Sequence, residues 1–248
     1  MDWNDAMGRT VDPAPMDETE RQRLLAQYSE IATLAGGLAH EIRNPLSTMS
    51  LNLELLIEDV QDSELPRDRR MLTKLQKVQQ EAEQLNELLN DFLQFARVTD
   101  QELVGTDVNV LVRDFVDFYR PTAKEYGIEV SLHLASNLPQ VRVDESLMRQ
   151  VLLNLAQNAR QAMPDGGHLE LQTFVLDDHV QLEFIDTGSG MSDATRAKIF
   201  QVFFSTKSDG SGLGLPTVRK IVEAHGGRIS CESEPGRGTR FLISLPAA

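Results

Sequence analysis

Near the start of the chain, a histidine and a glutamate stand side by side in a helix-like pattern. Leu38 and Ile42 occupy one apolar face of this pattern, which turns His40 and Asn44 outward. An exposed imidazole next to the carboxylate of Glu41 has the parts of an activated nucleophile. The carboxylate can hold the proton of one ring nitrogen while the other nitrogen attacks. The alternative is an ordinary surface histidine beside an ordinary surface glutamate, and this short segment, taken alone, favours that alternative.

Three motifs farther along the chain have residue types that bind nucleotides. Asn154 and Asn158 share one helix face, and an amide oxygen can ligate Mg²⁺ or hydrogen-bond a phosphate-bound water. Asp186 ends a predicted strand, where its carboxylate can accept a hydrogen bond from an exocyclic amine such as that of adenine. The Gly-rich stretch 210–214 opens a predicted helix, whose N-terminal N–H groups suit phosphates. Each motif alone is weak evidence for a nucleotide site, because asparagines and Gly-rich turns are common on protein surfaces.

Aromatic residues lie between the last two motifs. Phe203, Phe204 and Lys207 fall in residues 187–211, a Gly-, Ser- and Thr-rich stretch predicted to be a long functional loop. The phenylalanines either clamp this loop or belong to the core, and the loop sequence leaves both alternatives open.

Helical patterns surround and follow His40. The first pattern runs from about residue 20 to Val60. After a polar break over residues 61–68, apolar residues recur at spacings of four and three from Met71 to Ala96. Together they predict an antiparallel helical hairpin, with dimerisation into a four-helix bundle covering its apolar faces. Packing of the hairpin against its own chain is the alternative.

The second half of the chain has a mixed pattern. Residues 99–107 lack periodicity and are predicted to be a linker. Beyond it we predict helices at 108–126, 145–163 and 213–225, at most a short helix at 193–200, and strands at 128–134, 141–143, 168–176, 180–186, 228–233 and 239–245. Asp144 is a predicted helix cap, and Asp177-Asp178 a predicted tight turn. This order of elements indicates a two-layer α/β sandwich.

Composition narrows the classes of partner. The 248 residues carry a net charge of −14, which argues against nucleic acid or an anionic membrane as a direct partner. A single cysteine, Cys231, permits no intrachain disulfide and fits a cytoplasmic location. The sequence has no apolar run long enough to predict a membrane span. Residues 1–19 are acidic and aperiodic, and we expect a disordered lead.

The order of the motifs resembles that of bacterial two-component sensor histidine kinases. His-Glu-x-x-Asn-Pro precedes Asn-x-x-x-Asn-Ala, Asp-x-Gly-x-Gly, Phe-x-x-Phe-Phe-x-x-Lys, Gly-x-Gly-Leu-Gly-Leu and Pro-Gly-x-Gly-Thr-x-Phe. The resemblance covers about residues 20–248. It implies a dimerisation and histidine-phosphotransfer hairpin over 20–98. It further implies a Bergerat-type catalytic ATP-binding domain over 99–248, of the kind shared with gyrase, Hsp90 and MutL, with an ATP lid at about 187–214.

The resemblance also implies roles for individual residues. His40 would take a phosphoryl group from MgATP and pass it to an aspartate of a response regulator. Glu41 would activate His40, Asn44 would serve dephosphorylation of the regulator, and Asn158 would ligate Mg²⁺. The remaining implied nucleotide contacts are Asn154, Asp186, Gly188, Gly190, Phe203, Phe204, Lys207, Gly212, Leu213 and Gly214.

The motif wording is most similar to the nitrogen-regulation-like group, which implies a regulator of the enhancer-binding type. Gln161 departs from the family pattern, since many members carry a basic residue there, although Arg160 is adjacent. Pro216 stands where alanine is usual. The predicted protein is a cytoplasmic, homodimeric kinase. Its sequence does not choose between phosphorylation within one chain and between two chains.

Two alternatives come from other functional classes. One is a non-catalytic docking or phosphotransfer module with a dead ATP site, and the intact ATP motifs argue against it. The other is a stand-alone Bergerat ATPase such as a Ser/Thr anti-sigma kinase, and the hairpin with His40 argues against that.

Overall fold

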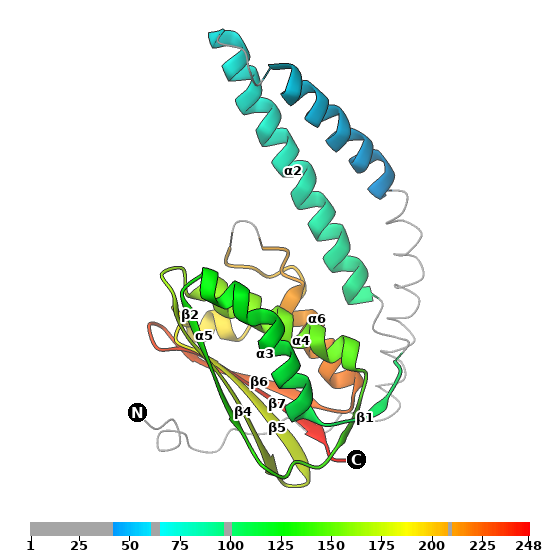
Figure 1. Ribbon diagram of the computed structural model, residues 1–248, viewed down its shortest axis with the longest axis vertical. Coiled ribbons are helices and arrows are strands. Elements are labelled where there is room, and N and C mark those ends of the chain that lie inside the picture. The colour runs from blue at the N-terminus through cyan, green and yellow to red at the C-terminus, as the bar shows by residue number, and fades with distance from the viewer. Residues whose placement is uncertain (1–41, 61–64, 97–100, 208–209) are drawn as a thin grey trace.

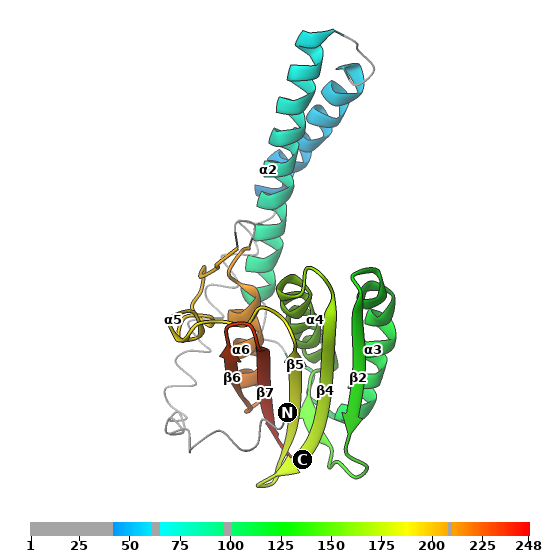
Figure 2. The ribbon, with the colours of Figure 1, turned by 90° about the vertical axis from the view of Figure 1, so that its left-hand side faces the viewer.

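The computed structural model describes residues 42–60, 65–96, 101–207 and 210–248. A helical arm projects from a body in which helices cover one face of a sheet (Figures 1 and 2). The arm consists of a helix over residues 42–60 and of α2 (Pro66–Ala96), which lie side by side in both views. This arrangement confirms the predicted helical hairpin over residues 42–60 and 65–96, and the expected lead at 1–19 and the start of the first predicted helix lie outside the described residues.

The arm has one buried side and one exposed apolar side. Leu46, Ala82 and Leu93 are buried. Every seventh residue on each helix is exposed and apolar, which makes an uncovered stripe: Ile42, Met49 and Leu56 on the first helix, and Met71, Val78 and Leu85 on α2. We call these six residues the exposed stripe. The predicted polar break is shorter than expected, because α2 already begins at Pro66, where proline fits the first helical position.

A five-stranded mixed sheet forms one layer of the body. Its order is β2-β4-β5-β7-β6, with β2 parallel to β4 and the other pairs antiparallel. The strands are β2 (Ile128–Leu134), β4 (Gly167–Leu176), β5 (His179–Asp186), β6 (Arg228–Glu234) and β7 (Gly238–Pro246). β4 and β5 are joined at Asp177 and Asp178, whose φ values of 48° and 58° confirm the predicted tight turn.

Three helices form the other layer: α3 (Val108–Glu125), α4 (Glu145–Ala162) and α6 (Gly214–Ala224). Between helices and sheet lies an apolar core that includes Leu152, Leu155, Leu171, Phe184 and Ile243. Burial of one face of each helix against one face of the sheet follows from their apolar periodicity. The predicted two-layer α/β sandwich is confirmed.

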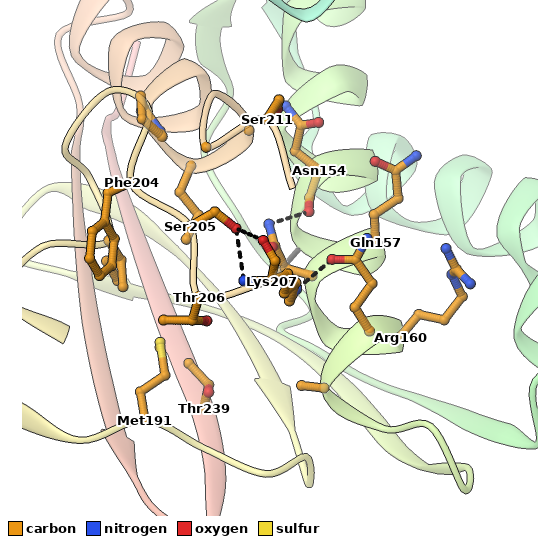
Figure 3. A pocket seen from close by; sticks show the side chains of 18 of the residues that line it. Asn154, Gln157, Arg160, Met191, Phe204, Ser205, Thr206, Lys207, Ser211 and Thr239 are labelled. Atoms are coloured by element: carbon orange, nitrogen blue, oxygen red, sulfur yellow. Dashed lines mark hydrogen bonds between the residues drawn. The ribbon is translucent and has the colours of Figure 1, made fainter. Parts of the chain in front are cut away.

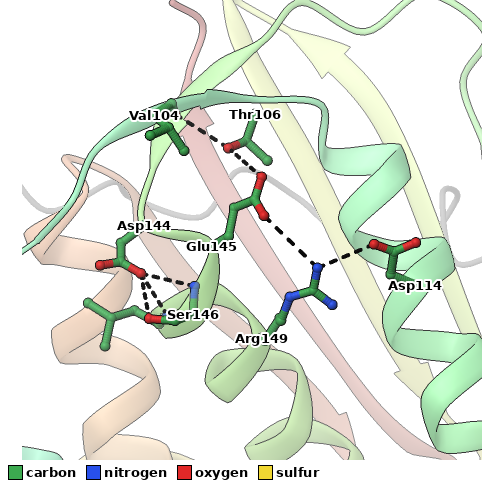
Figure 4. Close-up of polar contacts among 8 residues, drawn as sticks. Val104, Thr106, Asp114, Asp144, Glu145, Ser146 and Arg149 are labelled. Atoms are coloured by element: carbon green, nitrogen blue, oxygen red, sulfur yellow. Dashed lines mark hydrogen bonds and ion pairs between the residues drawn. The ribbon is translucent and has the colours of Figure 1, made fainter.

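Polar contacts hold the start of α4 in place (Figure 4). Asp144 caps this helix as predicted, accepting hydrogen bonds from the backbone nitrogens of Ser146 and Leu147 at 2.9 and 3.2 Å. Arg149 forms an ion pair with Asp114 of α3 at 3.2 Å. The cross-helix pair links α3 to α4, which carries both asparagines of the sequence motif.

One local expectation was wrong. The predicted linker contains β1 (Val104–Thr106), which pairs antiparallel with β3 (Val141–Val143). A three-residue strand that depends on a distant partner leaves no periodic signal in the sequence. The helix α5 (Asp193–Arg196) lies within the range where at most a short helix was predicted. Within the described ranges, no helix combines the length and apolar character needed to cross a bilayer.

Candidate functional site

A cavity of about 750 Å³ opens between α4, the end of β5, the start of α6 and the predicted lid (Figure 3). The Asn154, Gln157 and Arg160 side chains come from α4, and Ser205, Thr206 and Lys207 come from the predicted lid. The lining mixes polar and charged groups with few large apolar ones. Such a lining suits a charged ligand with many hydrogen-bonding atoms.

The α4 face of the cavity carries four amide side chains. Asn154, Gln157, Asn158 and Gln161 recur at helical spacing and all line the cavity. The Asn158 side-chain nitrogen donates to the backbone oxygen of Asn154 at 2.8 Å, so its Oδ1 is the atom left for a ligand. The Asn154 Nδ2 is buried and has no hydrogen-bond partner among the described residues. A buried donor without a partner is costly, and a bound acceptor would satisfy it.

Asp186 lies at the inner end of the cavity. Its carboxyl group is buried and accepts a hydrogen bond from the backbone nitrogen of Gly188 at 2.9 Å. Burial raises the pKa of Asp186 to about 6, because the charged form loses its hydration. Gly190 follows with φ of 64°, and a Cβ there would lie 1.9 Å from the carbonyl oxygen of Glu234. The chain therefore needs glycine at position 190 to pass so close to the next turn.

The predicted lid contacts α4 through Lys207. The Lys207 ammonium donates to the side-chain oxygen of Gln161. Burial and the nearby Arg160 guanidinium lower the pKa of Lys207, and the Asp186 carboxylate opposes them. The Ser205 hydroxyl oxygen accepts a hydrogen bond from the Lys207 backbone nitrogen at 3.0 Å, which stabilises the same segment. Two cationic side chains, at 160 and 207, thus lie at the cavity.

Phenylalanines and glycines shape the rest of the predicted lid. Phe204 lines the cavity, whereas Phe203 is 66% exposed. The backbone nitrogen of Phe203 donates to the carbonyl of Gly212 at 3.1 Å. Gly212 has φ of 67°, and a Cβ there would come within 2.6 Å of the Phe203 backbone. This close crossing of the two segments requires glycine at position 212.

The hairpin supplies another wall of the cavity. Glu87, Asn90 and Asp91 of α2 line it together with the residues of the body. Asn90 also accepts a hydrogen bond from the Arg43 guanidinium at 2.8 Å, which ties the first helix of the arm to this wall. None of these hairpin residues was predicted as part of the site.

The end of α2 is seated on the body by Lys220 of α6. This lysine is 7% exposed, and its ammonium donates to the Phe95 carbonyl at 2.6 Å. The same ammonium lies 4.7 Å from the centre of the Phe95 ring, within the range of a cation–π contact. Burial lowers the pKa of Lys220 to about 8.

The structure brings most of the sequence-predicted site residues of the body to one cavity. Those that line it are Asn154, Asn158, Asp186, Gly190, Phe204, Lys207, Gly212 and Gly214. Gly188, Phe203 and Leu213 are not among its lining residues: Gly188 supports Asp186, and Leu213 is buried. Asn44 is exposed on the arm, and His40 and Glu41 fall outside the described residues. Gln157 was missed, although its spacing from Asn154 placed it on the same helix face, whereas Gln161 was noted as a departure from the family pattern.

Two family models match the chain. Residues 30–101 match the His Kinase A (phospho-acceptor) domain. Residues 143–248 match the Histidine kinase-, DNA gyrase B-, and HSP90-like ATPase. The second match contains every cavity residue except those of α2.

Individual relatives extend these matches. The signal transduction histidine-protein kinase AtoS of Escherichia coli K12 is 32% identical over 231 residues, 92% of this chain and 37% of AtoS. The sensor histidine kinase ZraS of the same strain is 32% identical over 230 residues, 93% of this chain and 48% of ZraS. This chain therefore spans less than half the length of either relative.

Solved structures share the fold. Full-length ShkA in complex with AMPPNP matches with a TM-score of 0.68 and 32% identity, over 87% of this chain and 46% of ShkA. The complex of ThkA with the response regulator protein TrrA matches with a TM-score of 0.63 and 23% identity, over 93% of this chain and 65% of that one.

The raised pKa of Asp186 generates a stability prediction. The pKa of a free aspartate is near 3.8, so the folded state binds the proton more tightly than the unfolded state. The resulting loss of stability is absent below pH 3.8 and complete above about pH 6. Asp186→Asn removes that ionisation and should stabilise the free protein at pH 7.5 by on the order of 2–3 kcal/mol. Thermal denaturation should show a melting temperature raised by roughly 4–10 °C.

The pH dependence is the check on this prediction. At pH 5 the difference between Asp186→Asn and the unsubstituted protein should be about half as large as at pH 7.5. Asp165→Asn, which removes an exposed carboxylate, is the control and should show no such trend. A gain in the Asp186 variant that is equal at both pH values would contradict the burial argument.

Proposed function

The chain belongs to the two-component sensor histidine kinases, and we propose on this basis that it phosphorylates itself on His40 from MgATP. The phosphoryl group would then pass to an aspartate of a response regulator. The observation that carries the proposal is the cavity, which gathers Asn154, Asn158, Asp186 and Lys207 beside the hairpin of the phospho-acceptor domain. The reaction would take place in the cytoplasm, where ATP is available.

We assign the proposed roles to three successive parts of the chain. Residues 1–19 would form the lead, residues 20–98 the dimerisation and phosphotransfer hairpin, and residues 99–248 the ATP-binding domain with its lid at about 187–214. The contacts of the Lys220 ammonium with Phe95 bridge the two proposed domains. Lid and hairpin would together enclose the reacting phosphate.

The cavity chemistry fits ATP. The buried Asp186 carboxylate has the acceptor that the adenine amine needs, supported by the Gly188 N–H. At the phosphate end, the unpartnered Asn154 Nδ2 is a donor, and the Lys207 ammonium is a cation. Glycines at 212 and 214 let backbone atoms approach a phosphate closely. The solved relative ShkA is described in complex with AMPPNP, an ATP analogue, which supports the assignment.

Magnesium would depend on few protein ligands. Among the described residues, no group of three or more His, Cys, Asp or Glu side chains could hold a metal. Asn158 Oδ1 is the fitting ligand, because the other end of that amide is bonded to the helix backbone. Mg²⁺ typically takes one or two protein ligands plus phosphate oxygens and waters, and when bound it would neutralise phosphate charge.

The α4 face favours transfer over hydrolysis. An amide at Asn154 cannot accept a proton from water at neutral pH, so α4 supplies no general base for ATP hydrolysis. In the proposed reaction Glu41 activates His40 and Asn44 serves the reverse, dephosphorylating direction. Asn44 is exposed on the arm, as access by a partner requires.

The proposed partner is a response regulator that approaches the arm. ThkA, which shares the fold, is described in complex with a response regulator protein. The motif sequences of this chain are most similar to those of the nitrogen-regulation-like group, and this similarity favours a regulator of the enhancer-binding type. The regulator and the ATP-binding domain need the same histidine, so their two approaches would exclude each other.

The exposed stripe supports a homodimer. Its residues are 38–54% exposed, among them Leu85 at 53% and Val78 at 54%, and they recur every seven residues. Exposed apolar residues at heptad spacing are typical of a helix-bundle interface. A second copy of the hairpin would cover them in a four-helix bundle.

Labelling with ATP carrying ³²P at the γ-position tests the proposed function. Acid-labile label should appear on the unsubstituted protein and fall to background in His40→Gln. His133→Gln, which alters an exposed histidine of the sheet, is the matched control and should keep the label. Acid-stable label, or label that persists in His40→Gln, would contradict the proposal.

Magnesium dependence tests the metal assignment. Asn158→Ala should weaken nucleotide binding about 10–100-fold when magnesium is present, because the proposed protein ligand is lost. Isothermal titration with AMPPNP, with and without magnesium, measures the effect. Asn137→Ala, in an exposed loop outside the cavity, should bind normally. Unchanged affinity of Asn158→Ala with magnesium would show that the metal is held elsewhere.

Burying a charge in the exposed stripe tests the dimer. Leu85→Glu should raise the dimer dissociation constant on the order of 100-fold, since an unpaired carboxylate would be desolvated. Analytical ultracentrifugation over a concentration series measures this. Gln80→Glu introduces the same charge at an exposed position off the stripe and should remain dimeric. A Leu85→Glu protein that dimerises as tightly as the control would rule out this interface.

A further inference from the structure

We propose that His40 is phosphorylated in cis, by ATP bound to its own chain, with α2 forming a wall of the nucleotide cavity. This inference rests on the proposed function and adds the source of the phosphoryl group within the dimer. Three features carry it: the origin of the cavity wall, the link from that wall to the His40 segment, and the side of α2 on which a second copy would pack.

The wall of the cavity comes from the same chain. Glu87, Asn90 and Asp91 lie on one face of α2, at spacings of three and one, and all three line the cavity that holds Asn158 and Lys207. The hairpin of the chain is therefore already at the proposed nucleotide site.

Asn90 joins this wall to the segment that carries His40. The Arg43 guanidinium donates to Asn90 Oδ1 at 2.8 Å. Arg43 follows His40 by three residues, and three residues span at most about 11 Å even when fully extended. The short chain segment thus keeps His40 near Arg43, which is hydrogen-bonded to Asn90 of the cavity wall.

A second copy would pack on the other side of α2. Leu85 belongs to the exposed stripe, and rotation of about 100° per residue places it about 140° from Asn90 around the helix. The same rotation separates Leu85 from Glu87 by about 160° and from Asp91 by about 120°. The stripe and the cavity wall therefore occupy opposite faces of α2. A partner hairpin that packs on the exposed stripe would therefore be separated from the cavity by α2.

The hairpin is also anchored in this position. Lys220 bonds the Phe95 carbonyl at 2.6 Å and stacks on the Phe95 ring, one helical turn beyond Asp91. A buried ammonium loses most of its hydration, so a carbonyl and an aromatic face at this point compensate for burial. The contact fixes the end of α2 against α6, and α6 borders the cavity at Gly214.

Mixed dimers test the proposal. Two chains with different affinity tags and different masses are co-expressed, purified over both tags and incubated with MgATP carrying ³²P at the γ-position. In the first pair an unsubstituted chain is joined to a His40→Gln, Asn158→Ala double variant. Phosphorylation in cis predicts label on the unsubstituted chain at the same level per unsubstituted chain as in the unsubstituted homodimer, and therefore at about half the level per dimer. Absence of label from this pair would overturn the proposal.

The second pair joins a His40→Gln chain to an Asn158→Ala chain. Each chain lacks one half of the reaction, so phosphorylation in cis predicts background label, and subunit exchange cannot restore it. Label on the Asn158→Ala chain would show transfer between chains and overturn the proposal. The unsubstituted homodimer is the reference: if it stays unlabelled, the proposed kinase activity itself has failed, an outcome distinct from a choice of trans over cis.

Discussion

The contact between Lys220 and Phe95 joins the helical arm to the body, and both parts of the chain line the cavity. Lys220 is almost fully buried on α6, and its ammonium meets the carbonyl and the ring of Phe95 at the end of α2. A buried cation needs such compensation. With this end of α2 held against the body, the helical turn from Glu87 to Asp91 lines the cavity opposite α4 and the predicted lid. The cavity thus combines residues from a long helical arm with residues from a compact α/β body, and its composition depends on how the two are held together.

Electrostatics divides the cavity into two ends. At the inner end lies the buried Asp186 carboxyl group, whose pKa is raised to about 6 by burial. Its ionised form lowers the stability of the folded protein, but it provides a hydrogen-bond acceptor that is shielded from water. At the other end Arg160 and Lys207 bring positive charge, although the protein carries a net charge of −14. Lys207 reaches this position through Gln161, where many family members carry a basic side chain. The predicted lid therefore adds a second cation beside the Arg160 guanidinium of α4. A nucleotide, with a neutral base and anionic phosphates, matches this division.

Local sequence patterns predicted much of this structure. Heptad spacing from Met71 to Ala96 indicated α2, and alternation over residues 128–134 indicated β2, because each element buries one face. The spacing of Asn154 and Asn158 and the position of Asp186 at a strand end identified the body side of the cavity. β1 was missed, since three residues become a strand only through distant β3. Glu87, Asn90 and Asp91 were missed for a related reason. Nothing in an exposed polar helix face shows which domain will dock against it.

In the proposed mechanism, the hairpin of each chain closes the nucleotide cavity of the same chain. An ATP analogue with a photoreactive group on the γ-phosphate tests it most directly, with the crosslinked peptides identified by mass spectrometry. Dimers that pair an isotopically heavy chain with a light Asn158→Ala chain reveal whether the labelled hairpin belongs to the chain that binds the nucleotide. We expect adducts within residues 86–95 of the heavy, nucleotide-binding chain. Adducts confined to residues 143–248, or adducts on the light hairpin, would contradict it.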